Sequence, residues 1–319
     1  MQFVFIMDPI ERINIHADST FAMMLEAQNR GHVVLYGLAT GLRMENGTPM
    51  ATVHSCTLRA EEGNHADVGP AISVALREVD AVFMRRDPPF NMEYIFATYI
   101  LEAATPDTLI VNRPDSLRSH NEKLYSLAFP AFCPESMVSA DAKDILRFQD
   151  RLNTPIVVKP LDGNGGEAVF IVKQDDPNRH VILEVSTNHN TRTVIAQRYL
   201  PEAVAGDKRI LLVDGEFCGA VLRVPSPADH RGNIHVGAEC LAAPLTPREQ
   251  EMVEAIGPRV REDGHLFVGF DVIGDFLTEV NVTSPTGIHE INALEGRNVQ
   301  GDIIDAVERY CSASTKETN

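Results

Sequence analysis

A glycine-rich loop in the middle of the chain connects two strand-like segments, and this arrangement constrains the fold more than any other feature of the sequence. Lys159 ends an apolar run over 154–159, the loop follows over 160–166, and a second apolar run covers 168–173. A dinucleotide-binding glycine loop of the Rossmann type must be followed by a helix. Here a strand-like segment follows the loop, which excludes that interpretation. Glycines let backbone N–H groups approach phosphates closely, and a lysine neutralises phosphate charge. The loop therefore suits a triphosphate, although a plain hairpin loop has the same composition.

Asp271, Glu279 and Asn281 form a second polar set much later in the chain. Glu279 and Asn281 are two residues apart, so they share one face of a strand, and a short turn near 273–275 places Asp271 opposite Glu279. Three oxygen donors with no nearby cation repel one another unless a divalent ion joins them, and Mg²⁺ suits such a set. A solvated strand face is the alternative, but the apolar flank 267–270 indicates an interior strand. Together, the loop and this set predict an ATP-dependent ligase.

The first third of the chain alternates between strand-like and helix-like segments. This alternation predicts a parallel, doubly wound sheet within an α/β architecture. The predicted strands are 3–7, 33–36, 79–84 and 109–112, and the predicted helices are 18–30 and 91–104. Residues 40–70 are polar and poorly periodic, and we expect them to form a variable excursion.

From about residue 120 the pattern changes to hairpins of strands with few helices between them. Asp214-Gly215 is a strong signal for a hairpin turn, and Thr246 to Glu249 has the spacing of a capping box. The predicted hairpins are 209–213 with 217–224 and 266–272 with 276–282, the predicted helices are 246–263 and 301–311, and residues 312–319 are expected to form a frayed tail.

Composition limits the classes of partner. The chain has 319 residues, enough for two or three domains, and a formal net charge of −17, whereas a protein that binds a phosphate backbone needs a broad basic surface. No apolar run is long enough to cross a bilayer, and the apolar start 3–7 stops at Asp8-Pro9 without a basic leader. Five scattered cysteines without a C-x-x-C pair fit reduced thiols. We expect a cytoplasmic protein with neither a nucleic-acid nor a membrane partner.

Arginines recur at the mouths of predicted loops. Arg85 and Arg86 follow the carboxyl end of a strand, where doubly wound sheets bind ligands, Arg209 and Arg223 flank a hairpin, and Arg231 lies in a glycine-containing loop. A guanidinium suits bidentate capture of a carboxylate. Each arginine alone is explained by a surface charge, but their recurrence in an acidic protein favours substrate contacts. No nucleophile–base pair stands out, which fits ligase chemistry, where the protein positions substrates and stabilises charge.

These motifs, in this order, resemble the prokaryotic-type glutathione synthetase family of the ATP-grasp superfamily over nearly the whole chain. The resemblance is carried by the segments 7–10, 13–15, 18–23, 84–90, 121–124, 159–166, 199–201, 206–209, 269–271 and 281–286. It implies an α/β (α+β) chain in which an N-terminal doubly wound parallel-sheet domain over 1–122 lies on the substrate side. An ATP-grasp module of two α+β subdomains over 123–311 and a flexible tail over 312–319 complete the implied organisation.

The resemblance also implies a reaction. ATP phosphorylates the cysteine carboxylate of γ-glutamylcysteine, and the amine of glycine then displaces phosphate from the acyl phosphate. The products are glutathione, ADP and phosphate. The resemblance further implies Mg²⁺ or Mn²⁺, two ions per site, and a homotetramer.

The resemblance assigns each role in this reaction to particular residues. ATP phosphates meet Lys123, Lys159, Gly163, Asn164, Gly165 and Gly166, and the adenosine part meets Gln197, Tyr199, Leu200 and Asp207. The metal ligands are Asp271, Glu279 and Asn281. The substrate side comprises Arg86, Arg209, Arg223, Arg231, Ser284, Pro285 and Thr286. Catalytic roles fall on Lys159, Arg209 and Arg223.

One segment departs from the family pattern. After residue 233, family members continue into a glycine-rich stretch that contains an arginine and a glutamate, whereas this chain reads Gly237-Ala238-Glu239-Cys240-Leu241. The replacement implies either slower turnover or substitution by Arg231. Another ATP-grasp carboxylate–amine ligase is the nearest alternative function, and segments 84–90 and 283–286 argue against it. A non-catalytic nucleotide-binding regulator is the alternative of another class, and the complete set of lysines and metal ligands argues against it.

Overall fold

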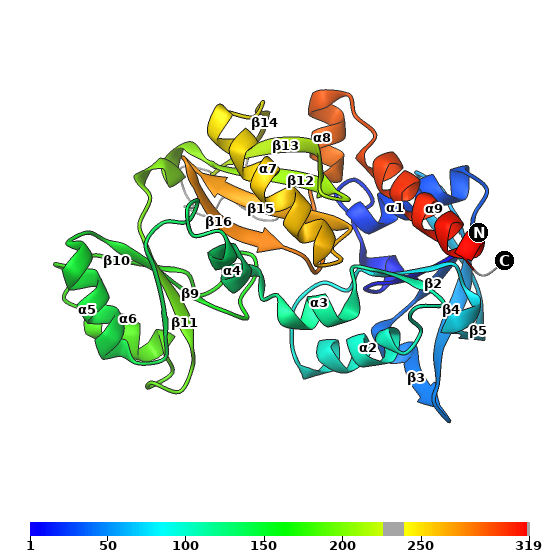
Figure 1. Cartoon of the computed structure of the whole chain (residues 1–319), viewed down its shortest axis with the longest axis horizontal. Helices are drawn as coiled ribbons and strands as arrows, with labels where there is room; N and C mark the ends of the chain where they lie inside the picture. The colour runs from blue at the N-terminus through cyan, green and yellow to red at the C-terminus, as the bar shows by residue number, and fades with distance from the viewer. Residues whose placement is uncertain (226–238, 318–319) are drawn as a thin grey trace.

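The computed structural model of the chain describes residues 1–225 and 239–317, and these residues form three β-sheets with helices around them (Figure 1). Short 3₁₀ helices lie at η1 (Ile10–Arg12), η2 (Ala39–Gly41), η3 (Leu76–Glu78), η4 (Ser126–Ala128) and η5 (Pro201–Ala205). Within the described ranges, no helix is both long enough and apolar enough to pass through a bilayer.

The first sheet has seven strands, and four of them, from β2 to the edge strand β7, are parallel. Its strands are β1 (Gln2–Ile6), β2 (Val33–Gly37), β3 (Leu42–Glu45), β4 (Thr48–Leu58), β5 (Ala66–Ala75), β6 (Ala81–Met84) and β7 (Leu109–Val111). The order β2-β1-β6-β7 is parallel throughout, as predicted. Strands β3, β4 and β5 extend the sheet with antiparallel pairing, so the prediction of an excursion over 40–70 is wrong. The pattern misled because most of β5 is exposed on both faces, which removes the usual alternation.

Helices cover both faces of this sheet, and strand β1 shows why. Phe3 and Phe5 belong to a core with α1 (Ser19–Asn29), α8 (Ile288–Glu295) and α9 (Val299–Glu317). Val4 and Ile6 point to the opposite face, where α2 (Met92–Glu102) and α3 (Pro114–Ser119) pack. Figure 1 shows α1 and α9 on one side of the sheet and α2 with α3 on the other. The doubly wound prediction is confirmed.

Helix α9 is longer than predicted. The sequence predicts a helix over 301–311 and a frayed tail after it, but α9 continues to Glu317, and only 318–319 lie outside the described residues. The helix lies against α1, where Arg30 bonds to Asp305 and to the carbonyl of Gly301. Packing against the rest of the chain, rather than local propensity, sets the length of such a helix.

The second sheet forms a small unit of its own. It has the order β10-β9-β11-β8, with β8 (Ser136–Ser139), β9 (Ile156–Pro160), β10 (Phe170–Val172) and β11 (Val194–Arg198), and with helices α5 (Ala142–Leu152) and α6 (Arg179–Ser186). Strands β9 and β10 are antiparallel, so the glycine loop joins two strands as predicted. The unit has a separate hydrophobic core that includes Phe148, Val158 and Leu183.

The third sheet is antiparallel and carries both predicted hairpins. Its order is β14-β13-β12-β15-β16, with β12 (Asp207–Val213), β13 (Glu216–Val224), β14 (Glu239–Ala242), β15 (Phe267–Ile273) and β16 (Phe276–Asn281). Asp214 and Gly215 have φ of 51° and 76°, so the left-handed turn predicted from Asp-Gly is confirmed. A Cβ on Gly215 would lie 2.4 Å from the carbonyl oxygen of Gly257 in α7 (Pro247–Glu262), so only glycine fits there. Helix α7 begins with the predicted capping box.

The first and third sheets share their cores. In β12, Ile210 and Leu212 join the core that contains Val4, while Leu211 and Val213 join the core that contains Phe3. The short helix α4 (Glu122–Tyr125) lies between these sheets and the second one (Figure 1). The fold therefore places one small sheet against a larger body of two fused sheets, with α4 at the junction.

Candidate active site

A cavity of about 550 Å³ lies where the second sheet, the third sheet and α4 meet. Nearly all residues singled out in the sequence line it: Lys123, Lys159, Gly163, Asn164, Gly165, Gly166, Gln197, Tyr199, Leu200, Asp207, Arg209, Arg223, Asp271, Glu279, Asn281, Ser284 and Thr286. Arg86 and Pro285 are not among its lining residues, and Arg231 lies outside the described residues. Ligand contacts by Arg86, Pro285 and Arg231 remain predictions.

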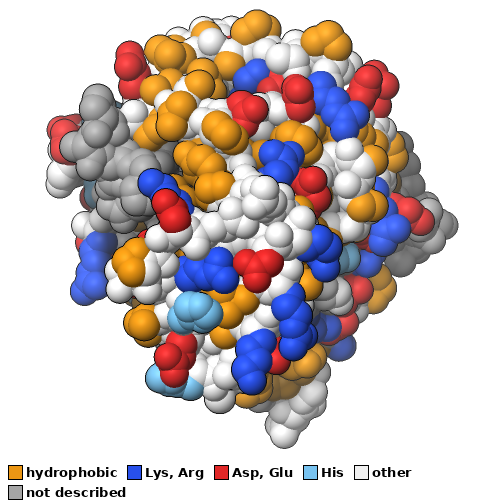
Figure 2. Space-filling model, turned by 90° about the vertical axis from the view of Figure 1, so that its left-hand side faces the viewer, with side chains coloured by type: hydrophobic (Ala, Val, Ile, Leu, Met, Phe, Trp, Pro, Cys, Tyr) orange, Lys and Arg blue, Asp and Glu red, His pale blue; other side chains and the backbone are white. Residues whose placement is uncertain are grey.

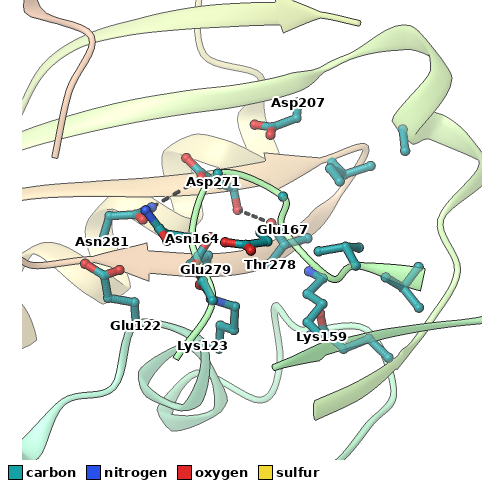
Figure 3. A pocket seen from close by; sticks show the side chains of 18 of the residues that line it. Glu122, Lys123, Lys159, Asn164, Glu167, Asp207, Asp271, Thr278, Glu279 and Asn281 are labelled. Carbon is teal, nitrogen blue, oxygen red and sulfur yellow. Dashed lines mark hydrogen bonds and ion pairs between the residues drawn. The ribbon is translucent and has the colours of Figure 1, made fainter. Parts of the chain in front are cut away.

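The carboxylates of the third sheet lie where the sequence predicts them. Asp271 of β15 is the direct antiparallel partner of Glu279 of β16, and Asn281 follows two residues later on the same strand (Figure 3). The Asn281 side-chain amide donates to Asp271 Oδ2 at 3.2 Å. Three oxygen-bearing side chains are thus gathered on one surface of the cavity.

The prediction that this set has no nearby cation is wrong. Arg209 donates to both oxygens of Asp271, from Nε at 2.9 Å and from Nη2 at 2.8 Å. Arg223 Nη2 lies 3.1 Å from Asp271 Oδ2 and also bonds to Asp207. Arg209 comes from the neighbouring strand β12, where it pairs with Asp271, a contact between residues far apart in the sequence.

The surroundings of Asp271 and Asp207 shift the pKa values of these two carboxyl groups in opposite directions. Burial raises the pKa of Asp271, but the charges of Arg209 and Arg223 outweigh it and hold that pKa well below its usual range. Burial also raises the pKa of Asp207, where Arg223 only partly opposes it. Asp271 is therefore a permanent anion with two guanidinium partners.

Two lysines face these carboxylates from the other side of the cavity (Figure 3). Lys123 Nζ lies 3.0 Å from Glu279 Oε1 and donates to the carbonyl of Gly163 at 2.5 Å. Lys159 sits on β9, and within the described ranges no carboxylate lies within ion-pair distance of it. Burial lowers the pKa of Lys159, and the charge of Lys123 lowers it further, while Glu279 opposes the shift. An anionic ligand between the two lysines would relieve this unfavourable arrangement.

The glycine loop has the backbone that close phosphate contact requires. Gly165 and Gly166 have φ of 61° and 77°, a region that favours glycine. A Cβ on Gly163 would lie 2.6 Å from Pro160 Cγ. The loop lines the cavity together with Asn164 and Glu167.

An apolar wall at one end of the cavity was not predicted from the sequence. It consists of Val157, Val169, Ile171, Leu200 and Ile273, beside the strand end that carries Gln197 and Tyr199. Alternation along 154–159 and 168–173 points to this wall, since alternate residues of such strands face outward. An apolar slot beside polar strand-end groups suits a planar heterocyclic base.

The opposite end of the cavity is polar. Ser284 and Thr286 line it, and Arg209 Nη1 donates to Thr286 Oγ1 at 3.3 Å. Arg85, not Arg86, is the deeply buried arginine after β6: it donates to Thr20 Oγ1 at 3.1 Å and to the carbonyl of Pro285 at 2.9 Å. Arg85 thus supports the segment behind Ser284 and Thr286.

The charges of the lining bear on metal binding. Six acidic and five basic residues line the cavity: Asp87, Glu122, Glu167, Asp207, Asp271, Glu279, Lys123, Lys159, Arg198, Arg209 and Arg223. A nearly balanced lining offers little net attraction for a triphosphate, so additional cations are needed. Two carboxylates and an amide form a hard-oxygen donor set, which fits Mg²⁺ or Mn²⁺ bound jointly by protein and phosphate.

The segment that departs from the family pattern is only partly described. Residues 237 and 238 lie outside the described ranges, and Glu239 to Leu241 lie in β14, where Cys240 pairs with Arg223 of β13. Slower turnover, or substitution by Arg231, therefore stays a prediction.

Two sequence-family models match the chain. The N-terminal domain of prokaryotic glutathione synthetase matches residues 1–118, and the ATP-grasp domain of the same family matches residues 122–296. The glutathione synthetase of Vibrio cholerae is 44% identical over 313 residues, which cover 97% of this chain and 98% of that protein. The glutathione synthetase of Shewanella oneidensis is 45% identical over 305 residues, covering 95% of this chain and 96% of that protein.

Solved structures with little sequence similarity share the fold. A D-cycloserine synthetase has a TM-score of 0.66 at 14% identity and covers 97% of this chain and all of its own. An ATP-grasp RimK domain protein from Sphaerobacter thermophilus has a TM-score of 0.62 at 17% identity and covers 96% of this chain and 99% of its own. The ATP-grasp architecture is therefore shared well beyond close relatives.

Proposed function

The chain belongs to the prokaryotic glutathione synthetase family, and from its cavity we propose how it performs that family's ATP-dependent ligation of γ-glutamylcysteine and glycine. Three regions of the cavity match three needs of the reaction. One region holds the nucleotide, one holds metal ions against its phosphates, and one holds the two molecules to be joined.

The nucleotide occupies the side formed by the second sheet. The base enters the apolar slot beside Gln197, Tyr199 and Leu200, and the ribose lies near Asp207. The phosphates lie between Lys123 and Lys159, and the backbone of 163–166 closes over them. Lys159 supports this placement because its half-buried amine has no carboxylate at ion-pair distance among the described residues.

Asp271, Glu279 and Asn281 hold Mg²⁺ or Mn²⁺ in this proposal, two ions when ATP is bound. The ions supply charge neutralisation of the transferring phosphoryl group. Arg209 and Arg223 fix the orientation of Asp271 and keep it ionised, as their hydrogen bonds indicate. In this proposal the same guanidinium groups also meet the substrate carboxylates or the transferring phosphoryl group.

The polar end of the cavity receives the acceptor molecules. The γ-phosphoryl group passes to the cysteine carboxylate of the dipeptide, which gives ADP and an acyl phosphate. The amine of glycine attacks the acyl carbon, the amide bond forms, and phosphate leaves with its bonding electrons. Arg86, Arg231, Ser284, Pro285 and Thr286 are the proposed contacts of substrate carboxylates and of the dipeptide.

The observation that carries the proposal is the opposition of Lys123, Lys159 and the glycine loop to the Asp271–Glu279 pair across one cavity. The test is ADP release by the purified protein with ATP, Mg²⁺, γ-glutamylcysteine and glycine, with each omitted in turn. We expect release only with all four components. Release with a different acceptor pair would move the substrate to another carboxylate–amine ligation, and no release in any mixture would favour a nucleotide-binding regulator.

The proposal also covers the compartment, the oligomeric state and the partners of the protein. We infer a cytoplasmic homo-oligomer, a tetramer by family resemblance, which light scattering of the purified protein tests. On the face shown in Figure 2, basic and acidic side chains are interspersed. A nucleic-acid partner requires a concentrated basic surface instead.

A further inference from the structure

Glu122, the first residue of α4, is a half-buried carboxylate for which the sequence assigned no role, and it lines the cavity. A single oxygen, Oε1, accepts three hydrogen bonds. The donors are the backbone N–H groups of Val282 and Thr283, both at 3.0 Å, and the hydroxyl of Thr283 at 2.7 Å. All three donors belong to one short segment of the chain.

That segment needs an external acceptor. Strand β16 ends at Asn281, and residues 282–287 belong to no helix or strand, so their N–H groups have no ladder of their own. Val282 and Thr283 are both buried, where an unpaired N–H group costs about 1–3 kcal/mol. Glu122 therefore supplies the bonds that fix where the chain goes after Asn281, a proposed metal ligand, and before Ser284 and Thr286.

The ionised form of a carboxyl group is disfavoured at this position. Burial raises the pKa of Glu122, and the charge of Glu279 raises it further, while the Thr283 bonds and Lys123 oppose the shift. None of the three bonds requires a negative charge on the acceptor, only an oxygen at that position. The geometry therefore separates two properties of Glu122, hydrogen-bond acceptance and charge.

The two residues beside Glu122 bind the opposite wall of the cavity. The Asn121 side chain donates to the carbonyl of Leu161 at 2.9 Å, and Lys123 donates to the carbonyl of Gly163 at 2.5 Å. Three consecutive residues thus connect the glycine loop on one side to segment 282–286 on the other. Of the three, only Glu122 serves the polar, acceptor end.

We propose that Glu122 is a positioning residue for the acceptor end of the site: as a hydrogen-bond acceptor it holds segment 282–286 in place, so that γ-glutamylcysteine and glycine bind against a preformed wall. This inference rests on the proposed function. It assigns Glu122 no contact with the nucleotide.

The test compares Glu122→Ala, Glu122→Gln and Thr283→Val by steady-state kinetics with each substrate varied. Loss of all three bonds in Glu122→Ala should raise KM for the dipeptide or for glycine by about tenfold or more, with KM for ATP changed by less than about threefold. Glutamine keeps an acceptor oxygen, so Glu122→Gln should stay within about threefold of the wild-type KM values. Thr283→Val removes one bond of the three and should raise KM for the same acceptor by roughly threefold.

Glu249→Ala is the matched control. Glu249 is a buried carboxylate that likewise accepts a backbone N–H bond, from Thr246, and it pairs with Lys208 at 2.7 Å outside the cavity. Its loss should lower the melting temperature without a selective change in any KM. If Glu122→Ala does not fold, Glu122→Gln and Thr283→Val still decide the question.

Three results would overturn the inference. Glutamine as harmful as alanine would show that charge, not acceptance, matters. An equal rise in KM for ATP and for the acceptors would remove the selectivity. A lower melting temperature with unchanged KM values would reduce Glu122 and Thr283 to a structural role. Wild-type protein that fails to release ADP would instead defeat the proposed function itself.

Discussion

The small unit of β8–β11 and the rest of the described chain differ in how their interiors are built. The small unit has its own core around Phe148 and Leu183. The first and third sheets, by contrast, share two cores, so the N-terminal part and the last helices form one body. Between the two units, polar contacts such as Lys123 to Gly163 and the stacking of Arg198 over Phe276 lie close to the cavity. The comparison teaches that the unit with its own core carries the loop proposed to cover the phosphates, and that the larger body carries the proposed metal and acceptor residues.

Substitutions that create a cavity in one core or the other test most directly whether the two units are stabilised separately. Phe148→Ala and Phe270→Ala each remove a buried ring and should cost about 3–5 kcal/mol locally. We expect Phe148→Ala to increase hydrogen exchange across 136–198 and to raise KM for ATP, with little change in the main thermal transition. Phe270→Ala should lower that main transition instead. The comparison fails if both variants lower the same transition equally.

Glu279→Gln tests the chemical role of the larger body. The change removes one carboxylate of the proposed metal set and the ion-pair partner of Lys123, so kcat should fall roughly 100-fold or more while ATP still binds measurably. Calorimetry measures the binding and ADP release measures the rate. Glu216→Gln, an exposed partner of Arg261 outside the cavity, is the control and should retain wild-type rates. Near-normal turnover by Glu279→Gln would exclude the metal assignment.

Acid should lower the free energy of unfolding of the larger body, because this body contains a buried histidine. His265 is fully buried in contact with His120, and burial with the neighbouring His120 charge lowers its pKa to about 3, while Asp263 opposes the shift. The unfolded chain binds this proton near pH 6.5, so stability is present above that pH and declines as the pH falls toward 3. The loss should reach up to about 2 kcal/mol at pH 5. His265→Asn should flatten the melting temperature between pH 7 and 5, and an unchanged slope would contradict this.

The smallest effect concerns the loop itself. Gly165→Ala meets no atom within 4 Å, so its cost is the strain of φ near 61°, about 1 kcal/mol. If the loop covers the phosphates as proposed, KM for ATP should rise roughly fivefold with little change in acceptor KM. Gly63→Ala has similar φ strain and open space in the first sheet's β4–β5 turn, and serves as the control. Equal kinetics for the two variants would contradict a role for the loop in ATP binding.

Features with a local signal could be predicted from the sequence. The glycine loop between two strands, the Asp214-Gly215 turn and the capping box at Thr246 each depend on neighbouring residues only. The pairing of Asp271 with Glu279 followed from a short turn between alternating strands. These elements bring most of the predicted residues to one cavity.

Features set by distant partners could not be predicted. The bidentate bond from Arg209 to Asp271 depends on which strands become neighbours in the third sheet, and spacing says nothing of that. Whether Arg85 or Arg86 is buried depends on Thr20 and Pro285, far away in the sequence. The β4–β5 hairpin was missed because an exposed edge strand lacks alternation. The length of α9 was missed because the helix is anchored by distant contacts, such as those of Arg30 with Gly301 and Asp305.

The position of α9 has a consequence for synthesis on the ribosome. The face of the first sheet that carries Phe3 and Phe5 is covered in part by Ile303 and Val307, which are translated near the end of the chain. A nascent chain therefore exposes this apolar face until α9 emerges, although β8–β11 can already close their own core. The earliest residues therefore wait longest for their final packing partners, and we expect the middle of the chain to close its core before the beginning does.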